Sequence, residues 1–91
     1  MLRVPTPLRE FVAGASSVMV EVADGAPISA VLDALAVDHP ALERRVRDEL
    51  GRARPHVNLF VGPDNVRDLD GLATPVDGTQ EVTILPAISG G

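Results

Sequence analysis

The chain has 91 residues, of which 45% are hydrophobic and 23% charged, and its formal net charge at pH 7 is −5. This length and composition indicate one globular domain rather than a disordered chain. The negative charge argues against nucleic acid or an anionic membrane surface as the main partner. Because no apolar run reaches the length of a membrane span and Met1-Leu2-Arg3 does not begin a signal peptide, we expect a cytoplasmic protein.

The sequence lacks most of the residue types that an autonomous catalyst needs. It contains no cysteine, so it has no thiolate nucleophile, disulfide or cysteine metal site. All eight basic residues are arginine, so no side-chain amine is present for a Schiff base or an isopeptide bond. His39 and His56 each stand beside a proline at an expected element boundary. We therefore expect a protein that is not an enzyme and that binds no metal or cofactor of its own.

The first part of the chain predicts two short strands with a helical turn between them. Residues 2–4 form the expected opening strand, which is cut short by the prolines that follow, and residues 7–12 form the turn, which ends at Gly14. The cleanest alternation of the chain runs over residues 17–22 and predicts a strand. Its core-facing residues would be Val18, Val20 and Val22.

Two helices are predicted next. Pro27 suits the start of the main helix, and apolar residues with helical spacing form a stripe that would lie on a sheet: Ile28, Val31, Leu32 and Leu35. This helix should end near Asp38-His39-Pro40, because the residue before proline avoids helical angles. A second helix is expected from Pro40 or Ala41 to Gly51, with Leu42, Val46 and Leu50 on its apolar side.

A run of arginines lies on and after the second predicted helix: Arg44, Arg45, Arg47, Arg52 and Arg54. One interpretation is a basic docking patch. The other is a solvated helix face that pairs with itself, since opposite charges stand four residues apart at Glu43–Arg47, Arg44–Asp48 and Arg45–Glu49. This spacing favours the self-paired face.

The second half predicts a strand over residues 56–61, with Val57, Leu59 and Val61 facing the core and Asn58 and Phe60 facing outward. A turn over residues 62–65 and a strand remnant at Val66-Arg67 should follow. Residues 69–76 have no clean period, and we expect Leu72 and Val76 to anchor them to the core.

Asp77-Gly78 predicts a tight turn into the last strand, Val82 to Leu85, and Pro86 should end the sheet pairing because it lacks an N–H donor. Val82 and Ile84 would face the core. Leu85 would face outward together with Phe60, which predicts an exposed apolar patch for docking. The expected partner-binding residues are Phe60, Leu85, Pro86 and Ile88.

Residues 1–86 are predicted to form the folded domain, and residues 87–91 an uncharged tail ending in Gly90 and Gly91. Five extended residues reach about 17 Å. Without a Cβ atom, Gly90 would fit a narrow channel, and the carboxylate of Gly91 would be open to reaction in a partner's active site. The alternative is an ordinary small-residue terminus with no use.

The predicted order of strands and helices indicates an α+β fold of two layers, with one main helix across one face of a mixed sheet and a short second helix. The first two strands would pair as a hairpin. The apolar last strand would lie in the middle of the sheet beside the first.

Three segments of the sequence resemble the ubiquitin-like sulfur carriers of the MoaD and ThiS type: the ending from Val82 to Gly91, the segment from Pro7 to Gly14, and Asp77-Gly78 with Glu81-Val82 after it. The second half is also similar in residue identity to the carrier of cysteine biosynthesis in actinobacteria. This likeness lies at Val57-Asn58, Val66-Arg67, Gly71-Leu72-Ala73-Thr74, Asp77-Gly78, Val82 to Ala87 and Gly90-Gly91. The first half matches in pattern more than in residue identity.

The resemblance implies a ubiquitin-like β-grasp fold and a known reaction. An ATP-dependent activating enzyme of the MoeB and ThiF type would adenylate the carboxylate of Gly91, and a sulfur donor would convert it to a thiocarboxylate. The acceptor would be a pyridoxal-phosphate cysteine synthase, with a zinc peptidase releasing the cysteine. The alternatives are the large subunit of molybdopterin synthase or the thiamin pathway. Two further readings are a protein modifier joined to lysines of targets and a binding module whose tail has no use.

Overall fold

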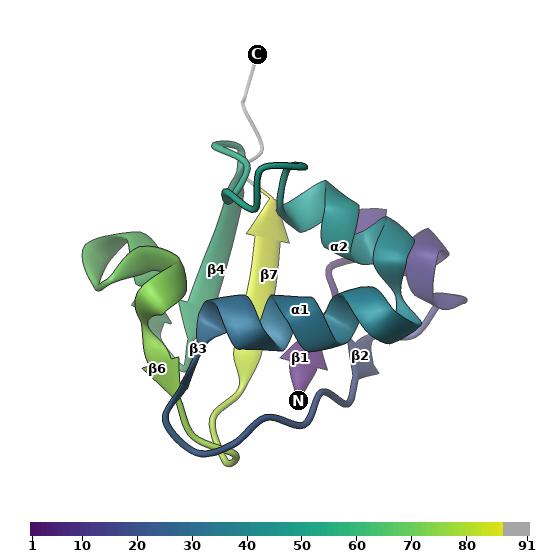
Figure 1. Cartoon of the computed structure of the whole chain (residues 1–91). Helices are drawn as coiled ribbons and strands as arrows, with labels where there is room; N and C mark the ends of the chain where they lie inside the picture. Colours follow the sequence, from purple (N-terminus) through teal and green to yellow (C-terminus); the bar gives the residue numbers. More distant parts are fainter. Residues whose placement is uncertain (87–91) are drawn as a thin grey trace.

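The computed structural model describes residues 1–86, which form an α+β fold with helices packed on a mixed sheet (Figure 1). The predicted tail, residues 87–91, lies outside the described residues. The elements in chain order are β1 (Leu2–Arg3), η1 (Thr6–Val12), β2 (Ser17–Val18), β3 (Ala26–Pro27), α1 (Ile28–Asp38), α2 (Pro40–Val46), β4 (Val57–Val61), β5 (Asp64–Asn65), η2 (Val66–Asp68), η3 (Gly71–Ala73), β6 (Pro75–Val76) and β7 (Val82–Pro86), where η marks a 3-10 helix.

The main sheet has the strand order β2-β1-β7-β4-β5. β1 and β7 run parallel, with Leu2 opposite Val82, while the other neighbours are antiparallel. The predicted hairpin of the first two strands and the central position of the last strand are both confirmed. A second, two-stranded sheet joins β3 to β6.

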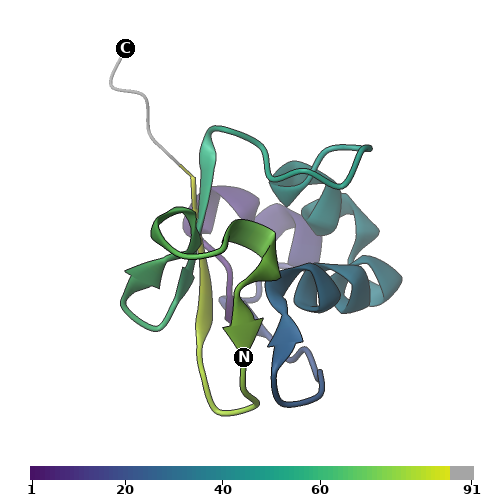
Figure 2. The same ribbon diagram turned by 60° about the vertical axis from the view of Figure 1, so that its left-hand side comes forward.

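The core lies between α1 and one face of this sheet. The apolar stripe of α1 is buried as predicted, and Ile28 and Leu32 are 0% exposed. From the sheet, Leu59 and Ile84 fill the other side at 1% and 0% exposure. Val76 is buried and Leu72 packs against the core, as expected for the irregular segment. Figure 2 shows both helices on one side of β7, so the opposite face of the sheet carries no helix from α1 or α2.

The break between the two helices falls where it was predicted. His39 takes non-helical angles (φ −135°, ψ 64°) directly before Pro40, and it both ends α1 and precedes α2. His56 lies in the turn before β4. Both histidines are therefore boundary residues, as expected.

The second helix is shorter than predicted, and the placement of Leu50 on its apolar side was wrong. α2 ends at Val46, Arg47 is extended, and Leu50 is 73% exposed. The cause is the side chain of Asp48, whose Oδ1 accepts hydrogen bonds from the backbone N–H groups of Leu50 and Arg52, both at 2.9 Å. A short acidic side chain that binds nearby N–H groups stabilises a turn in competition with the helix.

Two strand predictions were also too long or misassigned. The pairing of β1 with β2 ends at Val18, because β1 has no residue opposite Val20 or Val22. Both valines still pack against the core, whereas Met19 is 72% exposed. Val66-Arg67 forms 3-10 helix η2 rather than a strand remnant. The side chain of Asn65 accepts a hydrogen bond from the backbone N–H of Arg67 and so caps this helix.

Candidate functional site

The last described residue of β7 marks the place from which the predicted tail departs. Pro86 lies opposite Val57, the first residue of β4, so β7 continues one residue beyond the predicted strand. The base of the tail is therefore paired with the first residue of β4, at one end of the main sheet. Ile88, Gly90 and Gly91 lie outside the described residues, and their predicted roles stay predictions.

Phe60 and Leu85 both lie on the sheet face that points away from α1. In the register of β4 and β7, Phe60 is opposite Thr83 and Leu85 is opposite Asn58, without a bulge from Val57 to Val61. α2 packs against α1 and η1 and not over this face. Phe60 is half-buried, and Leu85 is 45% exposed. The outward direction of both side chains follows the predicted alternation, whereas their use in docking stays a prediction.

A second surface at the same end of the molecule corresponds to the less favoured interpretation of the arginine run, a basic docking patch. A hollow of about 380 Å³ is lined by Phe11, Ala41, Arg44, Arg45, Arg54 and His56, and we call it the basic hollow. The guanidinium carbon of Arg45 lies 4.8 Å from the centroid of the Phe11 ring, a cation–π contact. The Nε–H of Arg54 donates to the backbone carbonyl of Arg44 at 2.8 Å. Two of the three arginines are thus held in place by contacts that do not neutralise their charge.

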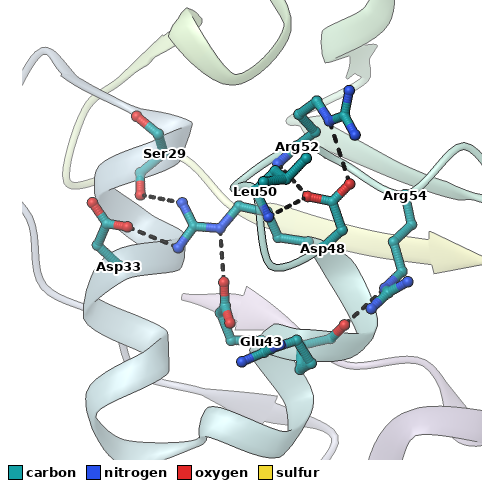
Figure 3. Close-up of polar contacts among 9 residues, drawn as sticks. Ser29, Asp33, Glu43, Asp48, Leu50, Arg52 and Arg54 are labelled. Carbon is teal, nitrogen blue, oxygen red and sulfur yellow. Dashed lines mark hydrogen bonds and ion pairs between the residues drawn. The ribbon is translucent and has the colours of Figure 1, made fainter.

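Arg47 differs from its neighbours because its guanidinium bonds to residues of α1. Figure 3 shows its partners Ser29 and Asp33 on α1 and Glu43 on α2. Its guanidinium donates to Asp33 and to Glu43, each at 2.7 Å, and more weakly to the carbonyl of Ser29 at 3.5 Å. Burial by itself would lower the pKa of Arg47, but its hydrogen bonds with Asp33 and Glu43 outweigh this and raise the pKa. Arg47 therefore joins α1 to α2 as a fixed cation.

The self-paired helix face is confirmed for Arg47 and wrong for Arg44 and Arg45. Within residues 1–86, Glu43–Arg47 forms, whereas Arg44–Asp48 and Arg45–Glu49 do not. Since the helix ends at Val46, the two acidic residues leave the helical register in which they would have met their partners. Asp48 instead pairs with Arg52 at 3.4 Å, and backbone N–H donors, that of Arg52 first, lower the pKa of Asp48.

Arg67 supports the segment that precedes β4. Its Nη2 donates to the carbonyls of Arg54 at 3.0 Å and Val57 at 2.8 Å, and its Nε donates to Asn58 Oδ1 at 3.1 Å. These bonds tie the loop carrying Arg54 to η2. Sequence reasoning missed this role, because main-chain acceptors leave no pattern in the sequence that could reveal them.

Other kinds of site find no support in the described part of the chain. Residues 1–86 contain no group of three or more His, Asp or Glu side chains placed to hold a metal ion. In that same range, each buried polar side-chain atom has a hydrogen-bond partner. None of the helices described there is both long and apolar enough to cross a membrane.

Comparison with known proteins decides the family. The model of the ThiS family matches residues 2–91, which includes both terminal glycines. The chain belongs to the ThiS family. The predicted sulfur-carrier family, and with it the prediction of a carrier rather than an enzyme, is confirmed.

Individual relatives agree with this assignment. The chain is 36% identical to sulfur carrier protein CysO of Mycobacterium tuberculosis, over 97% of this chain and 94% of that protein. It is 34% identical to small archaeal modifier protein 3 of Haloferax volcanii, over 99% and 96% of the two chains.

Solved structures confirm the ubiquitin-like β-grasp fold. The crystal structure of the Amycolatopsis orientalis BexX/CysO complex contains a chain that matches with a TM-score of 0.87 and 30% identity, covering 99% of this chain and 97% of that one. The crystal structure of M. tuberculosis CysO matches with a TM-score of 0.82 and 34% identity, covering 96% and 97%.

Proposed function

We propose that this ThiS-family chain carries sulfur as a thiocarboxylate on Gly91 and delivers it for cysteine biosynthesis. The observation that carries the proposal is the family match, which extends through Gly91, together with relatives named sulfur carrier protein CysO that align over 97% of the chain. The cysteine-specific part rests on those relatives and on the identities in the second half of the sequence.

The proposed chemistry takes place on the terminal carboxylate and in partner enzymes. An activating enzyme joins the Gly91 carboxylate to the α-phosphate of ATP, and pyrophosphate leaves. Sulfide then attacks the carbonyl carbon of the acyl-adenylate, AMP leaves with the electron pair of the broken C–O bond, and a thiocarboxylate remains. The carrier needs no acid or base of its own for these steps, and no ATP stays bound to it.

The folded domain supplies a firm base for the tail. β7 is the central strand, with hydrogen-bonded neighbours on both sides, and its inward residues Val82 and Ile84 are buried. Because the ladder with β4 continues to Pro86, the strand fixes where the tail begins. An active site that recognises the folded surface can thus find the base of the tail at a fixed position.

The proposed acceptor is a cysteine synthase. A thiocarboxylate is a soft nucleophile, and its sulfur would add to an aminoacrylate formed from an activated serine by loss of phosphate, which gives a thioester of Gly91. Transfer of the acyl group from sulfur to the adjacent amine would then leave one cysteinyl residue in amide linkage on Gly91. A zinc peptidase would release the cysteine and restore the carrier. We expect a cysteinyl adduct when the thiocarboxylate meets cysteine synthase and O-phosphoserine. Efficient molybdopterin or thiazole formation without that adduct, under the same conditions, would assign the chain to one of those pathways instead.

A second candidate function is protein modification through an isopeptide bond. It is favoured by the 34% identity to small archaeal modifier protein 3 and by a TM-score of 0.81 to the structure of SAMP1, both from Haloferax volcanii. Recovery of the chain linked through Gly91 to lysines of other proteins would support this function. The thiocarboxylate form of the chain is required for the sulfur-carrier function and not for this second function.

The central test is sulfur loading. The chain is incubated with the organism's ATP-dependent activating enzyme, ATP and sulfide, and intact mass reports the exchange of one oxygen for sulfur. Deletion of Gly91, or Gly90→Leu, should abolish loading while the melting temperature stays unchanged. Ala23→Leu adds comparable bulk at an exposed position elsewhere and should load normally. Normal loading of either tail variant would overturn the proposal.

A further inference from the structure

Unpaired positive charge gathers at one place on a chain whose formal net charge is −5. Within residues 1–86, ion pairs involve three of the eight arginines, namely Arg3, Arg47 and Arg52. Arg9 and Arg67 form none and donate to backbone carbonyls elsewhere. The remaining arginines without an ion pair are Arg44, Arg45 and Arg54. These three arginines line the basic hollow, and no carboxylate of the described residues lines it with them. The local charge therefore has the opposite sign to that of the whole protein.

Two of the three guanidinium groups of the hollow are held in position by contacts within the domain. Arg45 rests on the ring of Phe11, and Arg54 is fixed by its Nε–H bond to the carbonyl of Arg44. Arg67 anchors the backbone of Arg54 from the other side. Such groups keep further N–H donors for a ligand and lose less side-chain entropy when one binds.

The hollow also lies near the base of the tail. Arg54 and His56 belong to the segment that leads into β4, and Val57, the next residue, lies opposite Pro86. In Figure 1, α2 and this segment stand at the same end of the sheet as the end of β7. An enzyme that takes up the tail would therefore come close to the hollow.

We propose that the basic hollow binds an acidic segment of the activating enzyme and so orients the carrier while its tail enters the active site. This inference rests on the proposed function. Guanidinium groups pair with carboxylates through parallel hydrogen bonds, which favours Asp and Glu side chains as the ligand. A long nucleic acid is a poorer fit, because the rest of this acidic surface would repel its backbone. Opposite charges beside the tail would speed productive encounter more than they would add final affinity.

The test compares two double variants that remove the same charge. Arg44→Gln/Arg45→Gln removes two charges from the hollow, and Arg3→Gln/Arg52→Gln removes two from outside it. With the organism's activating enzyme at low salt, the hollow variant should lower kcat/KM for thiocarboxylate formation about 10-fold, and the control less than about twofold. The difference should shrink as salt is raised, because ions screen the interaction. Equal effects of both variants, or equal salt dependence of the hollow variant and the unchanged chain, would overturn the inference.

A binding measurement separates this inference from the proposed function. The chain lacking Gly91 cannot be loaded, yet its affinity for the activating enzyme should still fall with Arg44→Gln/Arg45→Gln. If the unchanged chain is never loaded but this salt-sensitive binding is found, the proposed function fails and the docking surface stands. If loading occurs but Arg44→Gln/Arg45→Gln leaves the affinity for the activating enzyme unchanged, only the inference fails. The inference would also be contradicted if Arg44→Gln/Arg45→Gln abolished binding to a single-stranded oligonucleotide and left binding to the activating enzyme intact.

Discussion

Replacement of Arg47 by methionine should lower the free energy of unfolding by about 2 kcal/mol. The methionine keeps most of the apolar stem and removes the cation that joins α1 to α2. The side chains of Arg47 and Glu43 are only 11% and 12% exposed, so the variant leaves a largely buried carboxylate without its partner. Removing one partner of a fully buried pair costs about 3–5 kcal/mol, and we expect roughly half of that at this partly covered site.

The other contacts of Arg47 add little to this figure. Asp33 is 71% exposed, and an exposed pair contributes about 0.5 kcal/mol. The bond to the carbonyl of Ser29 is long, at 3.5 Å. A domain of this size has a total stability of roughly 5–14 kcal/mol, so the variant should stay folded. Its melting temperature should fall by about 10 °C.

Urea denaturation of a small variant set measures this cost. Arg44→Met, in the last turn of α2 and without an ion pair, should change stability by less than about 0.5 kcal/mol. Arg47→Met/Glu43→Gln should recover about 1 kcal/mol relative to Arg47→Met, because no charge is left buried. Equal costs for Arg47→Met and Arg44→Met, or a double variant less stable than Arg47→Met, would refute the reasoning.

Two further predictions concern the open sheet face and the turn before β7. Phe60→Ala should weaken binding to the activating or acceptor enzyme about 10-fold, measured by calorimetry, and lower the free energy of unfolding by about 1 kcal/mol. Leu59→Ala in the core should lower it by about 2–5 kcal/mol. A large stability loss with unchanged binding would place Phe60 in the core. The pKa of Asp77 is lowered chiefly by the hydroxyl of Thr79 and then by backbone N–H groups. Its stabilising effect is therefore present above the ordinary pKa of about 3.9 and lost as pH falls below it. The stability difference between Asp77→Asn and the unchanged chain should shrink between pH 7 and pH 3, and an equal difference at both would contradict this.

Periodicity predicted the parts of the fold that depend on burial. Ile28, Leu32, Leu59 and Ile84 have the spacing of a helix stripe and of strand faces, and such spacing reflects the core directly. The central position of β7 could be predicted because its inward residues are apolar and it follows a clear turn. Phe60 and Leu85 were placed on the outer face by the same alternation.

The parts that failed depend on single polar side chains. Asp48 ends α2 by binding N–H groups that a helix would have used, and Asn65 starts a 3-10 helix where a strand was expected. Neither effect changes the hydrophobic pattern. The self-paired face was favoured over a basic docking patch for the same reason, because the early end of α2 separates Arg44 and Arg45 from the acidic residues expected to pair with them.

The central place of β7 also bears on when a newly made chain can fold. β1 and β4 both pair with β7, which is synthesised after them. During synthesis the edges of β1 and β4 therefore stay unpaired until β7 has emerged from the ribosome. Leu2 meets its partner Val82 only when nearly the whole chain has emerged. A chain interrupted before β7 would expose those edges to aggregation and to proteases. In the proposed function Gly91 follows β7, so the proposed reactive end would be made only after every strand of the sheet, and a half-made chain would offer an activating enzyme nothing to activate.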